Sequence, residues 1–113
     1  MKTLKTILTI IMFGVFSRKI VAAQDTTIVI KTSAQCESCK KRIENNMAFE
    51  KGVKKVTLDV DTKNLTLVYD KKKTSPEKLK TAVTKIGYDA DEMKANEKAY
   101  KKLPNCCKKD GHK

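Results

Sequence analysis

The chain has 113 residues, a length that leaves room for one domain and short flanking segments. Its formal net charge is +12, but the lysines are scattered among Asp and Glu, and only three Phe and three Tyr accompany them. This composition favours a solvated basic surface over nucleic-acid binding.

The first 23 residues have the outline of a secretory signal peptide. Lys2 and Lys5 form a basic start, residues 6–16 are an apolar run too short to span a membrane, and small residues at 21–23 offer a cleavage site. Cleavage would lower the formal charge from +12 to +8. We therefore expect an exported protein, periplasmic or in another compartment outside the cytoplasm. The alternative is an uncleaved anchor at the membrane interface.

Hydrophobic periodicity predicts alternating strands and helices after the signal peptide. Apolar residues alternate in the strand segments, and Cys39, Ile43 and Met47 recur every four residues, as in an amphipathic helix. Ser75 followed by Pro76 is typical of a helix start. The expected elements are a strand at 25–32, a helix at 36–49, strands at 53–60 and 65–69, a helix at 76–86 and an edge strand at 88–93.

This β-α-β-β-α-β order predicts an α+β fold, the ferredoxin-like sandwich. In that arrangement a four-stranded antiparallel sheet carries two helices on one face. The chain then divides into a signal peptide at 1–23, a domain at 24–94 and a C-terminal extension at 95–113. A short helix is expected at 96–103 within the extension, before a polar tail.

A Cys-x-x-Cys pair lies where the first strand gives way to the first helix. Cys36 and Cys39 are three positions apart, so the first helical turn brings their thiols to one small volume. Unpaired N–H groups at a helix start favour thiolate over thiol. We expect Lys40, Lys41 and Arg42 to act in the same direction, which predicts a dithiol that is reactive at neutral pH.

The tail holds a second pair of thiols, Cys106 and Cys107, and one imidazole, His112. Adjacent cysteines form a disulfide only with backbone distortion, and neither pair would close a loop long enough to stabilise the fold much. The cysteines therefore look placed for chemistry. Two interpretations of the tail stay open: inert thiols, or additional metal ligands that form a second site or complete a four-coordinate site with the first pair.

The sequence resembles the heavy-metal-associated domain family. The features that carry the resemblance are the Cys36-x-x-Cys39 pair opening the first helix, the element order, and the Ile86-Gly87-Tyr88 close of the second helix. The family includes small copper chaperones, the periplasmic mercury-binding protein of mercury-resistance systems, and the N-terminal modules of metal-transporting P-type ATPases. The resemblance extends over about residues 26–93.

The resemblance implies that Cys36 and Cys39 bind the metal. It also implies a place near the metal for Tyr88, because bacterial copper chaperones often carry a Tyr in the loop after the second helix. A packing role is the alternative for Tyr88. This chain departs from the family's usual Gly-Met-x-Cys start, since it reads Ser33-Ala34-Gln35-Cys36 and lacks the Met that normally packs under the loop.

Two thiolates without a nearby His or carboxylate make a soft site of low coordination number. Cu(I) is the expected ion, with Hg(II) and Zn(II) as alternatives, although Zn(II) prefers four ligands. We expect a metal carrier and not an enzyme, acting as a monomer or as a metal-bridged dimer. The expected partner is a metal-transporting membrane protein or another thiol-bearing acceptor, by family analogy. The alternatives are a thiol-disulfide redox protein and an interaction module with a structural disulfide.

Overall fold

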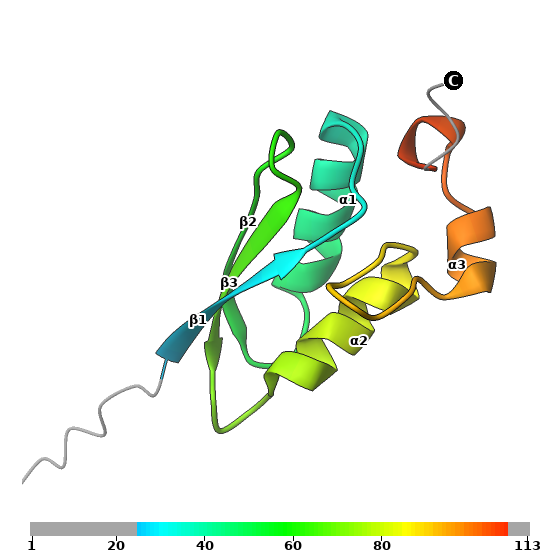
Figure 1. Ribbon diagram of the computed structural model, residues 1–113. Helices are drawn as coiled ribbons and strands as arrows, with labels where there is room; N and C mark the ends of the chain where they lie inside the picture. Colours follow the sequence, from blue (N-terminus) through cyan, green and yellow to red (C-terminus); the bar gives the residue numbers. More distant parts are fainter. Residues whose placement is uncertain (1–24, 109–113) are drawn as a thin grey trace, which may run out of the picture.

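The computed structural model describes residues 25–108 (Figure 1). The predicted signal peptide and His112 lie outside this range. None of the helices within it is long and apolar enough to cross a membrane.

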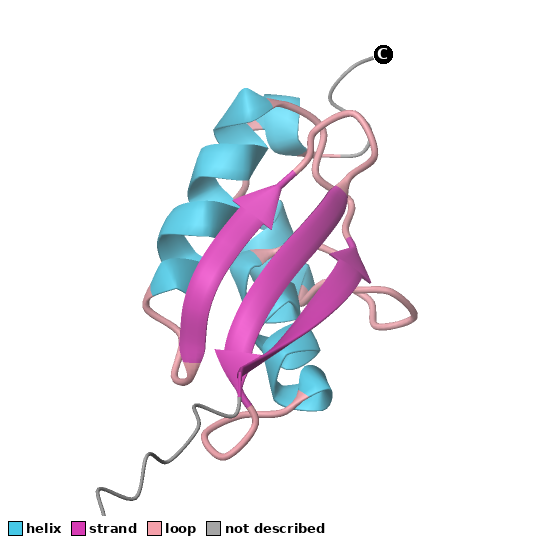
Figure 2. Ribbon diagram, turned by 90° about the vertical axis from the view of Figure 1, so that its left-hand side faces the viewer, coloured by secondary structure: helices cyan, strands magenta, loops and turns pink. Residues whose placement is uncertain are grey.

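Three antiparallel strands form one sheet in the order β1-β3-β2 (Figure 2). They are β1 (Asp25–Lys31), β2 (Val53–Leu58) and β3 (Asn64–Asp70). Burial alternates along β3, as the sequence pattern predicts for a strand with one covered face. Leu65 pairs with Ile30 on one side and with Leu58 on the other, so this row of apolar side chains crosses the sheet.

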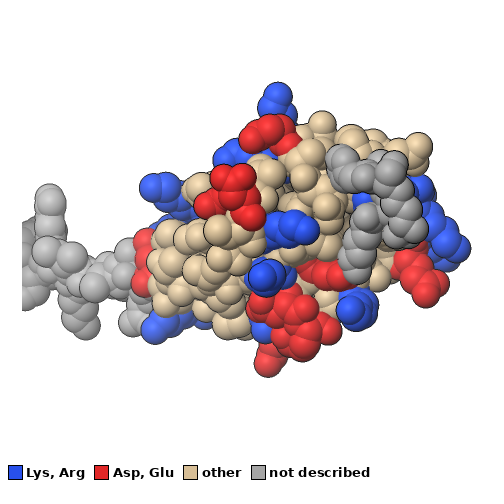
Figure 3. Space-filling model, turned by 45° about the horizontal axis from the view of Figure 1, so that its top comes forward, with Lys and Arg blue, Asp and Glu red and all other residues tan. Residues whose placement is uncertain are grey.

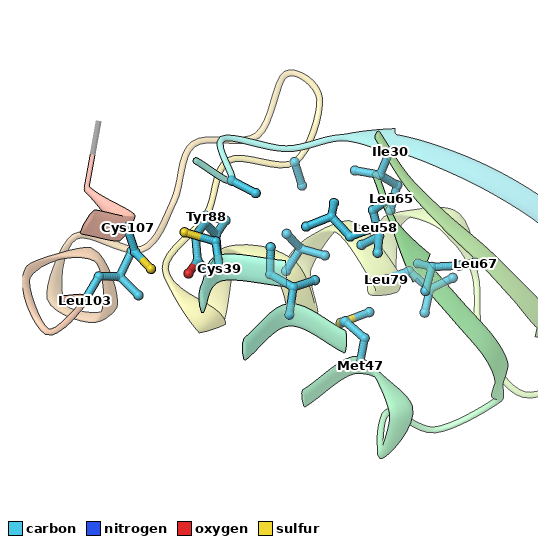
Figure 4. Close-up of a cluster of buried hydrophobic side chains, with 14 of the residues drawn as sticks. Ile30, Cys39, Met47, Leu58, Leu65, Leu67, Leu79, Tyr88, Leu103 and Cys107 are labelled. Carbon is cyan, nitrogen blue, oxygen red and sulfur yellow. The ribbon is translucent and has the colours of Figure 1, made fainter. Parts of the chain in front are cut away.

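Two helices cover one face of the sheet, α1 (Glu37–Ala48) and α2 (Pro76–Ile86). The Ser75 hydroxyl accepts a hydrogen bond from the Lys78 N–H at 3.4 Å, which confirms the predicted start of α2. Figure 4 shows the core between helices and sheet. Its fully or almost fully buried members include Ile30, Ile43, Met47, Leu58, Leu65, Leu67, Leu79 and Val83.

The predicted fourth strand at 88–93 is wrong, and Asp91 supplies the reason. Ala90 makes only isolated bridges, to Thr32 and to Met93, because the segment turns back on itself. Asp91 has a φ of 51°, outside the β region, and its carboxylate accepts the Lys31 N–H at 2.8 Å. The Asp91 N–H still donates to the Lys31 carbonyl at 2.8 Å, but a side chain takes the other bond of this pair, the ladder stops, and the described sheet has three strands.

The C-terminal extension packs on the helices. It contains α3 (Glu97–Lys101) and the 3-10 turn η2 (Asn105–Cys107), and Figure 1 shows η2 beside the first turn of α1. Asn96 begins α3: its side chain accepts the Ala99 N–H at 3.0 Å, and its own N–H donates to the Thr84 carbonyl at 3.0 Å. The predicted short helix is therefore present.

Gly87 permits this packing. It ends α2 in the left-handed conformation, with a φ of 118°. A Cβ atom on Gly87 would lie 3.1 Å from the Ala99 carbonyl and 3.2 Å from Leu103 Cδ2. The absence of a side chain thus serves both the helix end and the close approach of α3.

We predict that Gly87→Ala lowers the free energy of unfolding by about 1–2 kcal/mol, because the left-handed conformation is strained for residues with a Cβ atom. Urea unfolding of the reduced protein measures the loss. Gly87→Asn is the matched comparison, since Asn tolerates this conformation better but still crowds Ala99. Unchanged stability in Gly87→Ala would contradict the assignment.

Candidate metal centre

Cys36 is the residue from which α1 starts. It has extended backbone angles, with φ at −155°, and its carbonyl accepts the Lys40 N–H at 3.1 Å. No side chain caps this helix start through a hydrogen bond. The N–H groups of the first turn are therefore not capped by an oxygen acceptor from that residue.

The first thiol pair is compact. The Sγ atoms of Cys36 and Cys39 lie 3.6 Å apart, and these two cysteines are not joined by a disulfide. Cys36 is half-buried and Cys39 is fully buried. One thiol of the pair therefore faces the core and the other lies nearer the surface. An ion could reach the pair only from the side of Cys36.

The environment of Cys36 favours its thiolate. Burial alone would raise the pKa of this thiol, but hydrogen bonds from the backbone and thiol of Cys39, from the Ser38 N–H and from Cys106 outweigh it, so the pKa falls to about 7. Backbone N–H groups at the helix start thus lower the pKa of Cys36, as the sequence predicted. The thiolate is therefore a larger share of Cys36 at neutral pH than of an ordinary cysteine.

Lys40 was expected to favour the thiolate of Cys36, but it is not among the groups that lower the pKa of that thiol. Its ammonium group donates to the Leu58 carbonyl at 2.9 Å and lies 3.6 Å from the Glu44 carboxylate. Glu44 also accepts the Leu58 N–H at 3.0 Å, so this pair of charges joins α1 to β2. Lys40 is therefore committed to the fold, and hydrogen-bond donors close to Cys36 lower its pKa instead.

The loop before Cys36 is held against the segment that follows α2. The Ser33 hydroxyl accepts the Asp89 N–H at 2.9 Å, and the Thr32 hydroxyl accepts the Ala34 N–H at 3.2 Å. Ala34 is fully buried, although it stands where the family usually has Met. The loop thus keeps an apolar residue beneath it, with a smaller side chain.

Tyr88 is fully buried next to the thiols. Figure 4 shows its hydroxyl near the sulfur atoms of Cys39 and Cys107. That hydroxyl has no hydrogen-bond partner among residues 25–108. Burial raises the pKa of Tyr88 above its ordinary range, and the two thiols act in the same direction. Tyr88 therefore packs the site and also presents an unused donor to the sulfurs.

The tail thiols lie at the same place. The Sγ atoms of Cys36, Cys106 and Cys107 are all within 4.8 Å of one another, and those of Cys106 and Cys107 are 3.9 Å apart. The Cys36 thiol also donates to the Cys106 carbonyl at 3.6 Å. Cys107 is buried, whereas Cys106 is half-buried. The tail up to residue 108 is therefore part of the site region and not a detached segment.

Comparison with known proteins places this arrangement in a family. The heavy-metal-associated domain matches residues 29–89, more than half of the chain. The chain belongs to the heavy-metal-associated domain family. The copper-exporting P-type ATPase of Staphylococcus saprophyticus is 37% identical over 59 residues, which are 52% of this chain. Those residues are only 7% of that ATPase, so this chain spans a small part of its relative.

Solved structures of other proteins share the fold. Oxidized MerP from Ralstonia metallidurans CH34 superposes with a TM-score of 0.57 at 25% identity, covering 59% of this chain and 94% of MerP. The CopZ metallochaperone gives 0.55 at 21% identity, covering 57% and 98%. The family match ends at residue 89, so the extension with Cys106 and Cys107 lies outside the matched domain.

Sequence reasoning did not identify what anchors the extension. Leu103, 5% exposed, packs beside Gly87, and the Asp89 carboxylate accepts the Ala95 N–H at 2.9 Å. The signals available were the Asn96 cap and the Pro104 stop, which predict a short helix but not where it docks. Docking depends on contacts between distant residues, which local patterns do not encode.

The lowered pKa of Cys36 predicts a reactive thiol in the reduced, metal-free protein. The alkylation rate of Cys36 by iodoacetamide should rise between pH 6 and 8 with a midpoint near 7, because the thiolate is the nucleophile. Burial raises the pKa of Cys107 to about 12, so Cys107 should stay unmodified over this range. Peptide mapping by mass spectrometry gives both rates, and a Cys36 midpoint near 8.5 would be inconsistent with this environment.

Tyr88→Phe removes a buried hydroxyl that has no hydrogen-bond partner in the metal-free protein. We predict that the free energy of unfolding stays within about 1 kcal/mol of the parent or rises, since no hydrogen bond is lost. Tyr69→Phe, at a residue that is 6% exposed on the sheet, is the matched control. Urea unfolding measures both variants, and a loss of several kcal/mol in Tyr88→Phe would show that the hydroxyl is bonded.

Proposed function

We propose that this protein binds one soft metal ion, Cu(I) or Hg(II), through Cys36 and Cys39 and passes it to thiols of another protein. The observation that carries the proposal is the pair of free Sγ atoms 3.6 Å apart at the start of α1. Thiolate ligands select soft ions. The lowered pKa of Cys36 means that binding displaces fewer protons at neutral pH than it would from an ordinary thiol.

Transfer by ligand exchange requires that a thiol of the acceptor protein can reach the bound metal ion. Cys36 is half-buried, so the ion would lie at the surface end of α1. Exchange would then proceed through an intermediate shared by thiols of both proteins. This carrier role needs no catalytic group, in keeping with a binding protein and not an enzyme.

The relatives support copper as the cargo. The curated relative reported above is named a copper-exporting P-type ATPase, and the CopZ metallochaperone shares the fold. By analogy, the acceptor is a metal-transporting membrane protein. Export through the segment at 1–23 would place the exchange outside the cytoplasm. Hg(II) is the alternative cargo, because it also accepts two-sulfur ligation.

Thiol-disulfide exchange is the second candidate function, because two thiols 3.6 Å apart with one pKa near 7 also suit that chemistry. The two candidates differ in what the reduced protein does. A carrier holds metal in stoichiometric amounts, whereas a redox protein turns over disulfide substrates without metal.

We predict that the reduced mature protein binds one equivalent of Cu(I) in competition with a chelator of known affinity. Cys36→Ser/Cys39→Ser should lose this binding, because serine hydroxyls are poor ligands for soft ions. Ser38→Ala is a matched control that alters the same turn and keeps every thiol and the Ser33–Asp89 hydrogen bond. Absence of competitive binding of Cu(I) and Hg(II) by the parent protein would overturn the carrier function in favour of thiol-disulfide exchange.

A further inference from the structure

We propose that Cys106 and Cys107 bind the same metal ion as Cys36 and Cys39, which makes a closed site of four sulfur ligands. This inference rests on the proposed function, since it adds ligands to that site. It also changes the ions that the site accepts. A set of four thiolates suits Zn(II), which prefers four ligands, whereas two thiols on a loop do not.

The sulfur separations fit a four-ligand site better than a linear one. With a metal–sulfur bond of about 2.3 Å, two sulfurs on opposite sides of an ion are about 4.6 Å apart, and two in a tetrahedral set are about 3.8 Å apart. The Cys36–Cys39 separation is 3.6 Å and the Cys106–Cys107 separation is 3.9 Å. Each pair is therefore already spaced as an edge of a tetrahedron.

The two pairs also face each other. The Sγ atoms of Cys36, Cys106 and Cys107 lie within 4.8 Å of one another. Cys39 Sγ is outside this group of three but lies 3.6 Å from Cys36 Sγ. Figure 4 shows the Cys107 sulfur directed toward Tyr88 and Cys39. Three of the four sulfurs are thus already gathered, and in a four-sulfur site the Cys39 side chain would turn toward them.

The extension delivers these thiols without a large ordering step. Leu103 is buried against Gly87, and the Cys107 N–H donates to the Pro104 carbonyl at 2.9 Å, which closes the η2 turn. Ligands already held at the site act as intramolecular ligands and raise the affinity for the ion. The conformational entropy of fixing the tail is therefore mostly lost before metal binds.

Tyr88 offers an independent indication of a ligand at this place. Its hydroxyl is buried, has no hydrogen-bond partner among the described residues, and lies near the sulfurs of Cys39 and Cys107. A buried donor without an acceptor is unfavourable. Metal-bound thiolates are better acceptors than thiols, so metal binding would give this hydroxyl a partner.

Binding is an exchange of protons for metal. Each cysteine that enters as a thiol forms one metal–sulfur bond and releases its proton to the solvent. No oxidant or reductant takes part. Four thiolates around Zn(II) leave a net charge of −2, next to the N–H groups of the first turn of α1, which favour negative charge.

The experiment compares Zn(II) and Cu(I) affinities of the full-length, reduced protein with those of Cys106→Ser/Cys107→Ser. We expect the Zn(II) affinity to fall by roughly a hundredfold or more when two of four ligands are removed, which is within the range of multivalent gains. Cu(I) should still bind, through Cys36 and Cys39. Asn105→Ser/Lys108→Ser is the matched control, because it introduces two serines beside the same pair and keeps the thiols.

The outcomes separate this inference from the proposed function. Equal Zn(II) affinities in the parent and in Cys106→Ser/Cys107→Ser would overturn the four-sulfur site, while Cu(I) binding by both would leave the carrier function standing. Absence of Cu(I), Hg(II) and Zn(II) binding by the parent protein would overturn both. Loss of Zn(II) binding in the variant, with the control unchanged, would support the inference.

A measurement on the parent protein alone covers the case in which the variant fails to fold. X-ray absorption at the zinc edge of protein loaded with one equivalent of Zn(II) counts the sulfur ligands directly. We expect four sulfurs at about 2.3 Å. Two or three sulfurs, with nitrogen or oxygen completing the shell, would overturn the four-sulfur site. A nitrogen ligand would indicate His112, the one histidine of the chain.

Discussion

Tyr88 is fully buried where three segments meet: the loop and first turn that carry Cys36 and Cys39, the end of α2, and the extension. Tyr88, Ala34 and Cys39 are fully buried members of one cluster of packed side chains. The hydrogen bond between Ser33 and Asp89 fixes the neighbouring backbone. Because the Tyr88 side chain lies near the sulfurs of Cys39 and Cys107, its packing links the first thiol pair to the extension.

The chemistry of the thiols follows from where the helix begins. Cys36 ends the loop in an extended conformation, so its sulfur lies close to N–H groups that have no partner within α1. The Ser38 and Cys39 groups and the neighbouring thiols then lower its pKa to about 7 against the effect of burial. Burial raises the pKa of Cys107, and the neighbouring Cys39 acts in the same direction, whereas the Tyr88 hydroxyl offsets only part of the rise. A difference in surroundings thus gives neighbouring thiols different reactivity.

Local patterns predicted most elements of the fold. Alternation located the strands, the spacing of Cys39, Ile43 and Met47 located α1, and the Ser75-Pro76 start located α2. The prediction of a fourth strand was wrong because Asp91 takes a left-handed conformation and its side chain accepts the Lys31 N–H. The hydrophobic pattern reveals neither feature. The place of the extension was left open, because it depends on contacts of Leu103 and Gly87 across the fold.

The number of sulfur ligands determines whether a metal site holds an ion or gives it up. Each thiol pair here has one buried member, Cys39 or Cys107, and one half-buried member, Cys36 or Cys106. In a four-sulfur site the half-buried sulfurs would form the outer edge, so an incoming thiol would displace Cys106 or Cys36 first. Loss of the Cys106 bond alone leaves an ion still held by buried sulfur. Stepwise exchange at this edge would allow both high affinity and transfer, because the ion keeps sulfur ligands at every step.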